Sequence, residues 1–191
     1  MFSGCSVSGE VDVDKVPVEI LEPRDGLTNA LLFVDYEHHE VHSGSAYILS
    51  NQALLGSGAT FEYVINTSGM QGKQVHLLVL ARSTSEANLF IYENVTWTGG
   101  TTNGEANRNR NLNKTALVTI IQDATVLTTQ TKILEEHFGN GRNIGGESRS
   151  VLEFILKENE TYSIEFESEA SNNDVSWLIE WYEHTPKEAI N

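Results

Sequence analysis

Cysteine is almost absent from this sequence, which has a single one, Cys5, among 191 residues. One cysteine excludes an internal disulfide and a metal site built on a cysteine pair. The segment Phe2–Cys5 is weakly similar to a lipoprotein cleavage site, but neither a basic segment nor an apolar stretch precedes it. We therefore expect a protein that is made in a reducing cytosol and is not exported by a signal of its own.

Long apolar runs are also missing, since no stretch approaches the roughly eighteen residues of a membrane helix. Basic residues are scarce: 12 Lys and Arg stand against 27 Asp and Glu, giving a formal net charge of −15. Such a surface repels phosphate backbones, so we expect neither a nucleic-acid partner nor a membrane partner. The simplest interpretation of the negative net charge is that it keeps the protein soluble.

Sequence signals of catalysis are missing as well. There is no Gly-x-Ser-x-Gly elbow, and the glycine-rich segment 139–146 lacks the Lys-Ser/Thr pair of a phosphate loop. With so many carboxylates, accidental pairs are inevitable, and sequence spacing identifies no glycosidase pair. We therefore predict that the protein is not an enzyme and needs no cofactor.

Alternation of apolar and polar residues is the dominant pattern, and it is clearest between Ser148 and His184. Alternate residues of a strand point to opposite faces, so each alternating run predicts a strand with one buried face. The short polar loops between the runs predict an antiparallel meander that forms the centre of the core. The apolar positions of the three runs are Leu152, Phe154 and Leu156, then Tyr162, Ile164 and Phe166, then Val175, Trp177, Ile179 and Trp181.

Similar strand signals recur through most of the chain. We count nine or ten short strands, with turn signals roughly every ten residues and no convincing amphipathic helix. This pattern predicts an all-β fold, an antiparallel two-sheet β-sandwich with jelly-roll topology, over residues 29–191.

Residues 1–28 differ from the rest, because they hold two of the three prolines and a series of apolar residues separated by acids. Such a segment suits an edge strand or an extended N-terminal arm that lies on another surface. A disordered tail is the alternative. The apolar positions of the predicted arm are Val11, Val13, Val16, Val18 and Ile20.

Histidines cluster at His38, His39 and His42, at the start of a predicted strand that is interrupted at Ser43–Ser45. On a strand, His38, Glu40 and His42 would share one face, an arrangement that can hold a metal ion. A further ligand would have to come from the remaining histidines, and hydrogen-bonding or interface roles explain the cluster better. We therefore assign no metal site. The remaining histidines are His76, His137 and His184.

Four of the twelve basic residues are arginines that lie between Trp97 and Ser150, mostly in Asn- and Gly-rich segments. On an acidic protein they can pair with carboxylates of a neighbouring copy or of a partner. The alternative is an internal role, such as Arg149 bridging Glu153 across strands. The four are Arg108, Arg110, Arg142 and Arg149.

Several stretches resemble, in the same order, a family of tailed-bacteriophage virion proteins. The similar region runs from about Tyr36 to His184 and does not include the arm. The stretches are Glu37-His38-His39-Glu40-Val41-His42-Ser43-Gly44, Asn107-Arg108-Asn109-Arg110-Asn111, Gly145-Gly146-Glu147-Ser148-Arg149, Glu153-Phe154-Ile155-Leu156 and Trp177-Leu178-Ile179-Glu180-Trp181-Tyr182-Glu183-His184.

The family is that of capsid decoration, or cement, proteins with a jelly-roll body. The resemblance implies a homotrimer on the outer surface of the phage head, at junctions between capsomers of the major capsid protein, and supplies no catalytic residues. We predict that the valine-rich arm and the four arginines make the capsid or inter-subunit contacts. Two alternatives remain: a carbohydrate-binding jelly roll that uses Trp97 or Tyr92, and a metal-dependent, cupin-like enzyme that uses the histidines.

Overall fold

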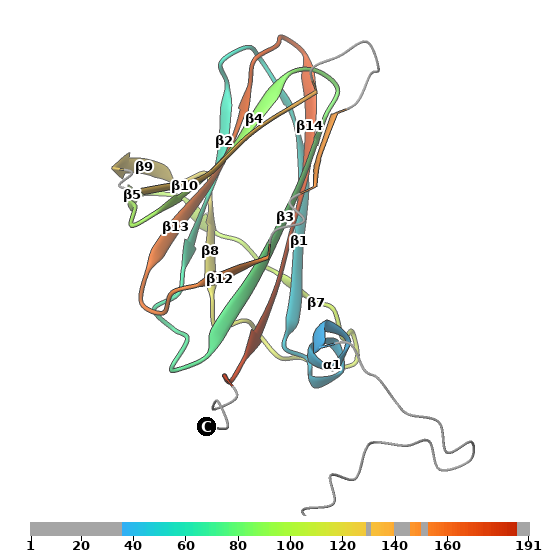
Figure 1. The fold of residues 1–191 in the computed structure, drawn as a ribbon, viewed down its shortest axis with the longest axis vertical. Coiled ribbons are helices and arrows are strands. Elements are labelled where there is room, and N and C mark those ends of the chain that lie inside the picture. Colours follow the sequence, from blue (N-terminus) through green and yellow to red (C-terminus); the bar gives the residue numbers. More distant parts are fainter. Residues whose placement is uncertain (1–35, 129–130, 140–145, 150–152, 187–191) are drawn as a thin grey trace, which may run out of the picture. The chain divides into compact units, whose positions relative to one another are not determined.

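The computed structural model describes residues 36–128, 131–139, 146–149 and 153–186, and these residues form two large antiparallel sheets packed face to face (Figure 1). The predicted all-β sandwich is therefore confirmed. The predicted arm, residues 1–28, lies outside the described residues.

The first sheet has the strand order β11-β3-β14-β1-β7, with β12 also paired to β3, and the second has the order β10-β4-β13-β2-β8-β6. The strands of the first sheet are β1 (Ala46–Leu55), β3 (Gln74–Ser83), β7 (Ala106–Asn107), β11 (Gly146–Arg149), β12 (Phe154–Leu156) and β14 (Asn173–His184). Those of the second are β2 (Thr60–Asn66), β4 (Ala87–Glu93), β6 (Thr101–Thr102), β8 (Thr119–Gln122), β10 (Thr131–Phe138) and β13 (Thr161–Ser168). A separate pair consists of β5 (Thr96–Thr98) and β9 (Thr125–Thr128).

The topology is that of a jelly roll, as predicted. In each sheet, strands from the first half of the chain alternate with strands from its second half: β1, β14, β3 and β11 in one, and β2, β13, β4 and β10 in the other. The main strands cross between the sheets at each connection, from β1 to β2, from β2 to β3 and from β3 to β4. Interleaving of this kind is the result of two Greek keys wrapped into one sandwich.

The predicted meander of the last three strands is wrong. The strand β13 pairs with β2 and β4, whereas β12 and β14 lie in the other sheet, where both pair with β3. The alternating pattern identified the buried faces of these strands correctly, but it carries no information about which strand lies beside which. Consecutive strands instead face one another across the sandwich.

Aromatic side chains from both sheets meet in the core. The indole of Trp177 on β14 lies 4.4 Å from the ring of Phe61 and 4.9 Å from that of Phe166, measured between ring centroids. Its Nε1 donates a hydrogen bond to the hydroxyl of Tyr63 at 3.0 Å. Because Phe61, Tyr63 and Phe166 belong to the second sheet, Trp177 joins the two layers.

The only helix in the described part of the chain, α1 (Tyr36–Ser43), occupies the region that was predicted to begin a strand. It ends at Gly44, whose φ of 71° is the left-handed conformation that terminates many helices. The amide of Gly44 donates to the Val41 carbonyl at 3.1 Å and that of Ser45 to the Glu40 carbonyl at 2.9 Å, which completes a Schellman motif. The predicted interruption at Ser43–Ser45 therefore marks the end of a helix.

Candidate interaction surface

The outer face of the first sheet carries an apolar patch, defined here as Ile48, Leu78, Leu80 and Leu178. Leu80 on β3 lies directly opposite Leu178 on β14, and Leu78 and Ile48 flank Glu180 in the next row. All four are only partly buried. Their position on the outside of a sandwich whose inner face is fully packed leaves them available to a partner.

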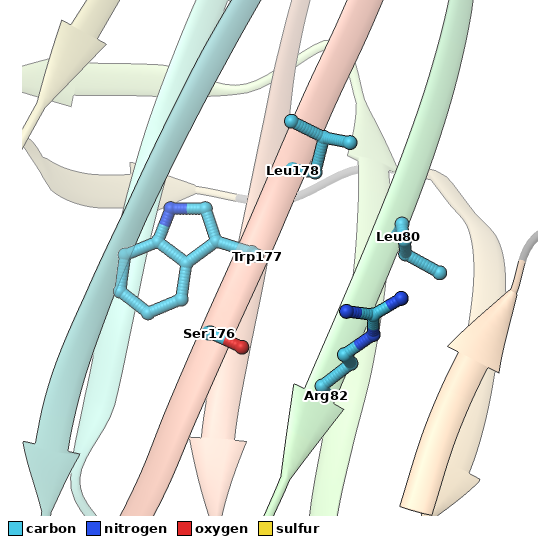
Figure 2. Close-up of a pocket in the computed structure, with 5 residues that line it drawn as sticks. All are labelled: Leu80, Arg82, Ser176, Trp177 and Leu178. Atoms are coloured by element: carbon cyan, nitrogen blue, oxygen red, sulfur yellow. The ribbon is translucent and has the colours of Figure 1, made fainter.

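A shallow depression of about 170 Å³ lies within this patch (Figure 2). It is lined by Leu80 and Arg82 of β3 and by Ser176, Trp177 and Leu178 of β14. Arg82 is exposed and provides a basic group at the edge of the depression. A patch that combines leucines with an arginine resembles the centre of a protein–protein interface, where apolar residues and Arg are enriched.

The edge of β1 next to the patch is open over most of its length. The strand β7 pairs only with Tyr47 and Ile48, and no other described strand pairs with β1 on that side. The Ala46 carbonyl accepts the Arg108 amide there at 2.9 Å, which shows that alternate residues from Ala46 onward point their backbone groups to this side. Ser50, Gln52 and Leu54 therefore point theirs to the open edge.

This open edge lacks the usual protection against pairing. Edge strands are commonly protected by charged residues, proline or a bulge. The sequence of β1, AYILSNQALL, has no charged residue and no proline, and its register with β14 is unbroken. The side chain of Leu54 is 69% exposed, and the amide of Gln52 donates to the Asn51 side chain at 2.8 Å rather than to a described neighbouring strand. The edge is therefore suited to accept an extended segment of a partner.

The outer face of the second sheet has the opposite character, because carboxylates line it. Glu165 on β13 lies directly opposite Glu62 on β2, and Glu167 follows on the same face. Burial, and then the charge of Glu165, raise the pKa of Glu62 to about 7. Burial, and then Glu167, raise the pKa of Glu165 above its ordinary value. The outer face of the second sheet thus carries a group of carboxylates, whereas that of the first sheet carries the apolar patch around Glu180.

Replacing Glu62 by glutamine is expected to reduce the pH dependence of the free energy of unfolding. The carboxyl titrates near 4.5 when unfolded and near 7 when folded, so the unfolded chain loses this proton first. The stability contributed by the protonated group is complete below pH 4.5 and is lost as the pH rises through 7. Because solvent screens this half-buried group, we expect a contribution of about 1 kcal/mol.

Urea unfolding of both proteins below pH 4.5 and above pH 7 measures this contribution. The loss of stability between the two conditions should be about 1 kcal/mol smaller in Glu62→Gln than in the wild type. An equal loss in the two proteins would show that Glu62 does not titrate between these limits.

The histidine cluster is on a helix rather than on a strand, so the predicted shared face of His38, Glu40 and His42 is wrong. Residues four apart on a helix lie side by side, which brings Nε2 of His38 to 3.0 Å from Nε2 of His42. Glu40 points the other way and is buried, with its carboxylate accepting a hydrogen bond from Ser43 at 3.1 Å. His39 lies beside Glu40, with its Nδ1 at 3.3 Å from a carboxylate oxygen.

Of the other three histidines, His184 lines a depression together with His39, Glu40 and Ser43 of α1. His76 stacks on Tyr182, with 4.5 Å between ring centroids, and lies 4.6 Å from the ring of His184. His137 is bonded to Asn88 on the second sheet. In the described part of the chain, no group of three or more His, Cys, Asp or Glu residues is arranged to hold a metal ion.

The predicted contact arginines are only partly described. Arg108 forms an ion pair with Glu37 of α1, so it joins the loop after β7 to the helix. Arg110 donates a long hydrogen bond, 3.4 Å, to the carbonyl of Asn107. The side chain of Arg149, on β11, and the whole of Arg142 lie outside the described residues. So do the five apolar arm positions, Val11, Val13, Val16, Val18 and Ile20.

The two candidate sugar-stacking residues are partly buried. Trp97 and Tyr92 pack against a small cluster formed by Val64, Val95 and Ala124. This cluster fills the space between the β5–β9 pair and the outer face of the second sheet. The packing reduces the ring area that a sugar could stack against.

Two features of the sequence belong to the interaction surface, but neither identifies that surface without the structure. Leu78 and Leu80 break the alternation of β3, because both are apolar residues on its outer side, and the described residues leave both partly exposed. The absence of charge from β1 is visible in the sequence, but only the topology shows that β1 lies at an open edge.

Comparison with family models, with curated proteins and with solved structures found no match to this chain. No helix in the described residues has both the length and the apolar character needed to cross a bilayer.

Proposed function

We propose that this protein is a structural component of a tailed-bacteriophage virion that decorates the outer surface of the capsid and stabilises it. It binds across the boundary between neighbouring capsomers of the major capsid protein, as a homotrimer. It is made in the host cytoplasm and catalyses no reaction. The resemblance of the five sequence stretches to decoration proteins suggests this role, and the jelly-roll topology agrees with it.

The observation that carries the proposal is the difference between the two faces of the sandwich. On a chain with a formal net charge of −15, the outer face of the first sheet combines four partly exposed apolar residues with an uncharged, open edge strand. Such a surface favours contact with another protein, whereas the acidic face favours solvent. We therefore place the capsid or a neighbouring copy against the apolar patch and the β1 edge.

The mechanism of stabilisation is mechanical. Packaged DNA strains a capsid, and a protein that binds across a capsomer boundary adds contact area that must be lost before the capsomers separate. A standard interface buries roughly 1,600 Å² in total. A trimer binds through several such contacts at once, so contacts that are individually modest give a high overall affinity.

Binding to heads assembled from the major capsid protein alone tests the proposal. The purified protein should sediment with such heads and raise the temperature at which they disrupt, because it binds the intact lattice preferentially. Light scattering of the free protein should give three times the mass of the chain. Failure to sediment with the heads would contradict the proposed function, and a monomer would contradict the trimer.

Deleting residues 1–28 is expected to weaken this binding by about tenfold or more, because the variant loses one of several simultaneous contacts. Sedimentation across a concentration series measures the change, and far-UV circular dichroism checks that the β body still folds. Unchanged binding would rule out the arm as an anchor without affecting the proposal that the apolar patch binds the capsid.

A further inference from the structure

Two histidines on α1 present a pair of converging nitrogens at the surface. Nε2 of His38 and Nε2 of His42 are 3.0 Å apart, and the two rings meet edge to face with 4.6 Å between their centroids. Both side chains are exposed. The spacing of four residues places the two imidazoles on one side of the helix, one turn apart.

The separation of the two nitrogens matches that of adjacent ligands of one metal ion. Bonds from imidazole nitrogen to a divalent ion are about 2.0–2.1 Å long. Two such bonds at a right angle place the nitrogens about 2.9 Å apart, and at a tetrahedral angle about 3.4 Å apart. The observed 3.0 Å is closer to the right angle, which is the angle in the square-planar and tetragonal sites of Cu²⁺ and Ni²⁺.

We propose that His38 and His42 bind one Cu²⁺ or Ni²⁺ ion through their Nε2 atoms. Imidazole is a good ligand for both ions, and Cu²⁺ binds more tightly than Ni²⁺ to a given set of ligands. Among the described residues no third His, Cys, Asp or Glu joins the pair. Water fills the remaining positions, so the site is open to a ligand from another molecule.

The helix that carries the site is held firmly against the rest of the domain. The Asn109 side chain donates to the His42 carbonyl at 3.1 Å, and the Asn107 side chain donates to the Gly44 carbonyl at 2.9 Å. Glu37 is tied to Arg108 by an ion pair. An anchored helix keeps the two imidazoles one turn apart, so binding of an ion costs little conformational entropy of the backbone.

The site is independent of the proposed function, since neither histidine belongs to the apolar patch or to the β1 edge. Without a metal ion, the same geometry allows one ring to donate a hydrogen bond to the other. A metal ion competes with protons for the ring nitrogens, so acid should release it.

Calorimetric titration of the untagged full-length chain with CuCl₂ or NiCl₂ alone tests the site. All proteins carry Cys5→Ser, so that the thiol does not bind the ion. We expect one ion per chain, and roughly tenfold or more loss of affinity in His38→Ala and in His42→Ala. Alanine favours the helix, so both variants should keep α1. The matched control is His39→Ala, whose ring lies beside Glu40, and its affinity should stay within about twofold of the parent.

Electron paramagnetic resonance of the Cu²⁺ complex gives a second, structural readout. The spectrum should show coupling to two imidazole nitrogens in the parent and in His39→Ala, and to one in His42→Ala. Absence of saturable binding would overturn the proposal, as would equal affinities in the His38→Ala and His42→Ala variants and their parent. An equal loss in His39→Ala would also overturn it.

Discussion

Replacing Trp177 by alanine should lower the free energy of unfolding by about 3–5 kcal/mol. The indole is only 3% exposed and contacts Phe61 and Phe166 from the opposite sheet. Its removal leaves a large cavity between the layers and removes the hydrogen bond that the indole N–H donates to the Tyr63 hydroxyl. A domain of this size is stable by only about 5–15 kcal/mol, so the variant should lose a large part of its stability.

Urea unfolding followed by far-UV circular dichroism measures this loss without relying on tryptophan fluorescence. The matched control is Trp97→Ala, the same substitution at a partly buried ring outside the main core. We expect a clearly smaller loss there. A loss of about 1 kcal/mol or less in Trp177→Ala, which is typical of a surface substitution, would contradict the conclusion that this residue joins the two sheets.

The fold class could be predicted from the sequence because alternation reports burial directly. Val175, Trp177, Ile179 and Trp181 were predicted to share a buried face, and all four side chains are buried. Which strands pair with each other could not be predicted in the same way. The strands that pair with β14 lie more than ninety positions earlier in the chain. The short loops between the last three runs instead predicted hairpins, which this jelly roll does not form there.

Helix α1 was missed for a different reason. Its sequence, YEHHEVHS, is polar on nearly every side, so it has no apolar stripe with helical spacing. A strand and a helix would both place His38 and His42 on one face, but they differ in where Glu40 lies. On a strand Glu40 would lie between His38 and His42, whereas on the helix those two histidines meet directly and Glu40 is buried beneath them.

The roles of the charged residues depended on tertiary contacts. Arg108 was predicted to contact the capsid or a neighbouring copy, with an internal role as the alternative. Within the chain it forms an ion pair with Glu37, about seventy residues earlier, which sequence spacing does not indicate. The acidic face could not be predicted either, because Glu62 and Glu165 become neighbours only when β2 pairs with β13. Net charge in the sequence therefore indicated an acidic surface but not which carboxylates become neighbours.

Replacing Leu178 by aspartate should weaken binding to capsid heads roughly thirtyfold or more, which corresponds to about 2 kcal/mol. Leu178 lies opposite Leu80 in the centre of the apolar patch, so a bound partner would bury the new carboxylate against apolar side chains. The side chain is only partly buried in the free protein, and the variant should therefore fold. Thermal unfolding of the free variant checks this point.

Leu127→Asp is the matched control, since it makes the same substitution at a residue that is 60% exposed on β9, outside the first sheet. Sedimentation of the two variants with heads assembled from the major capsid protein tests most directly whether the apolar face of the sandwich binds the capsid. Loss of binding in Leu178→Asp with full binding in Leu127→Asp is the predicted result. Full binding of a folded Leu178→Asp variant would contradict the assignment of this face to the capsid.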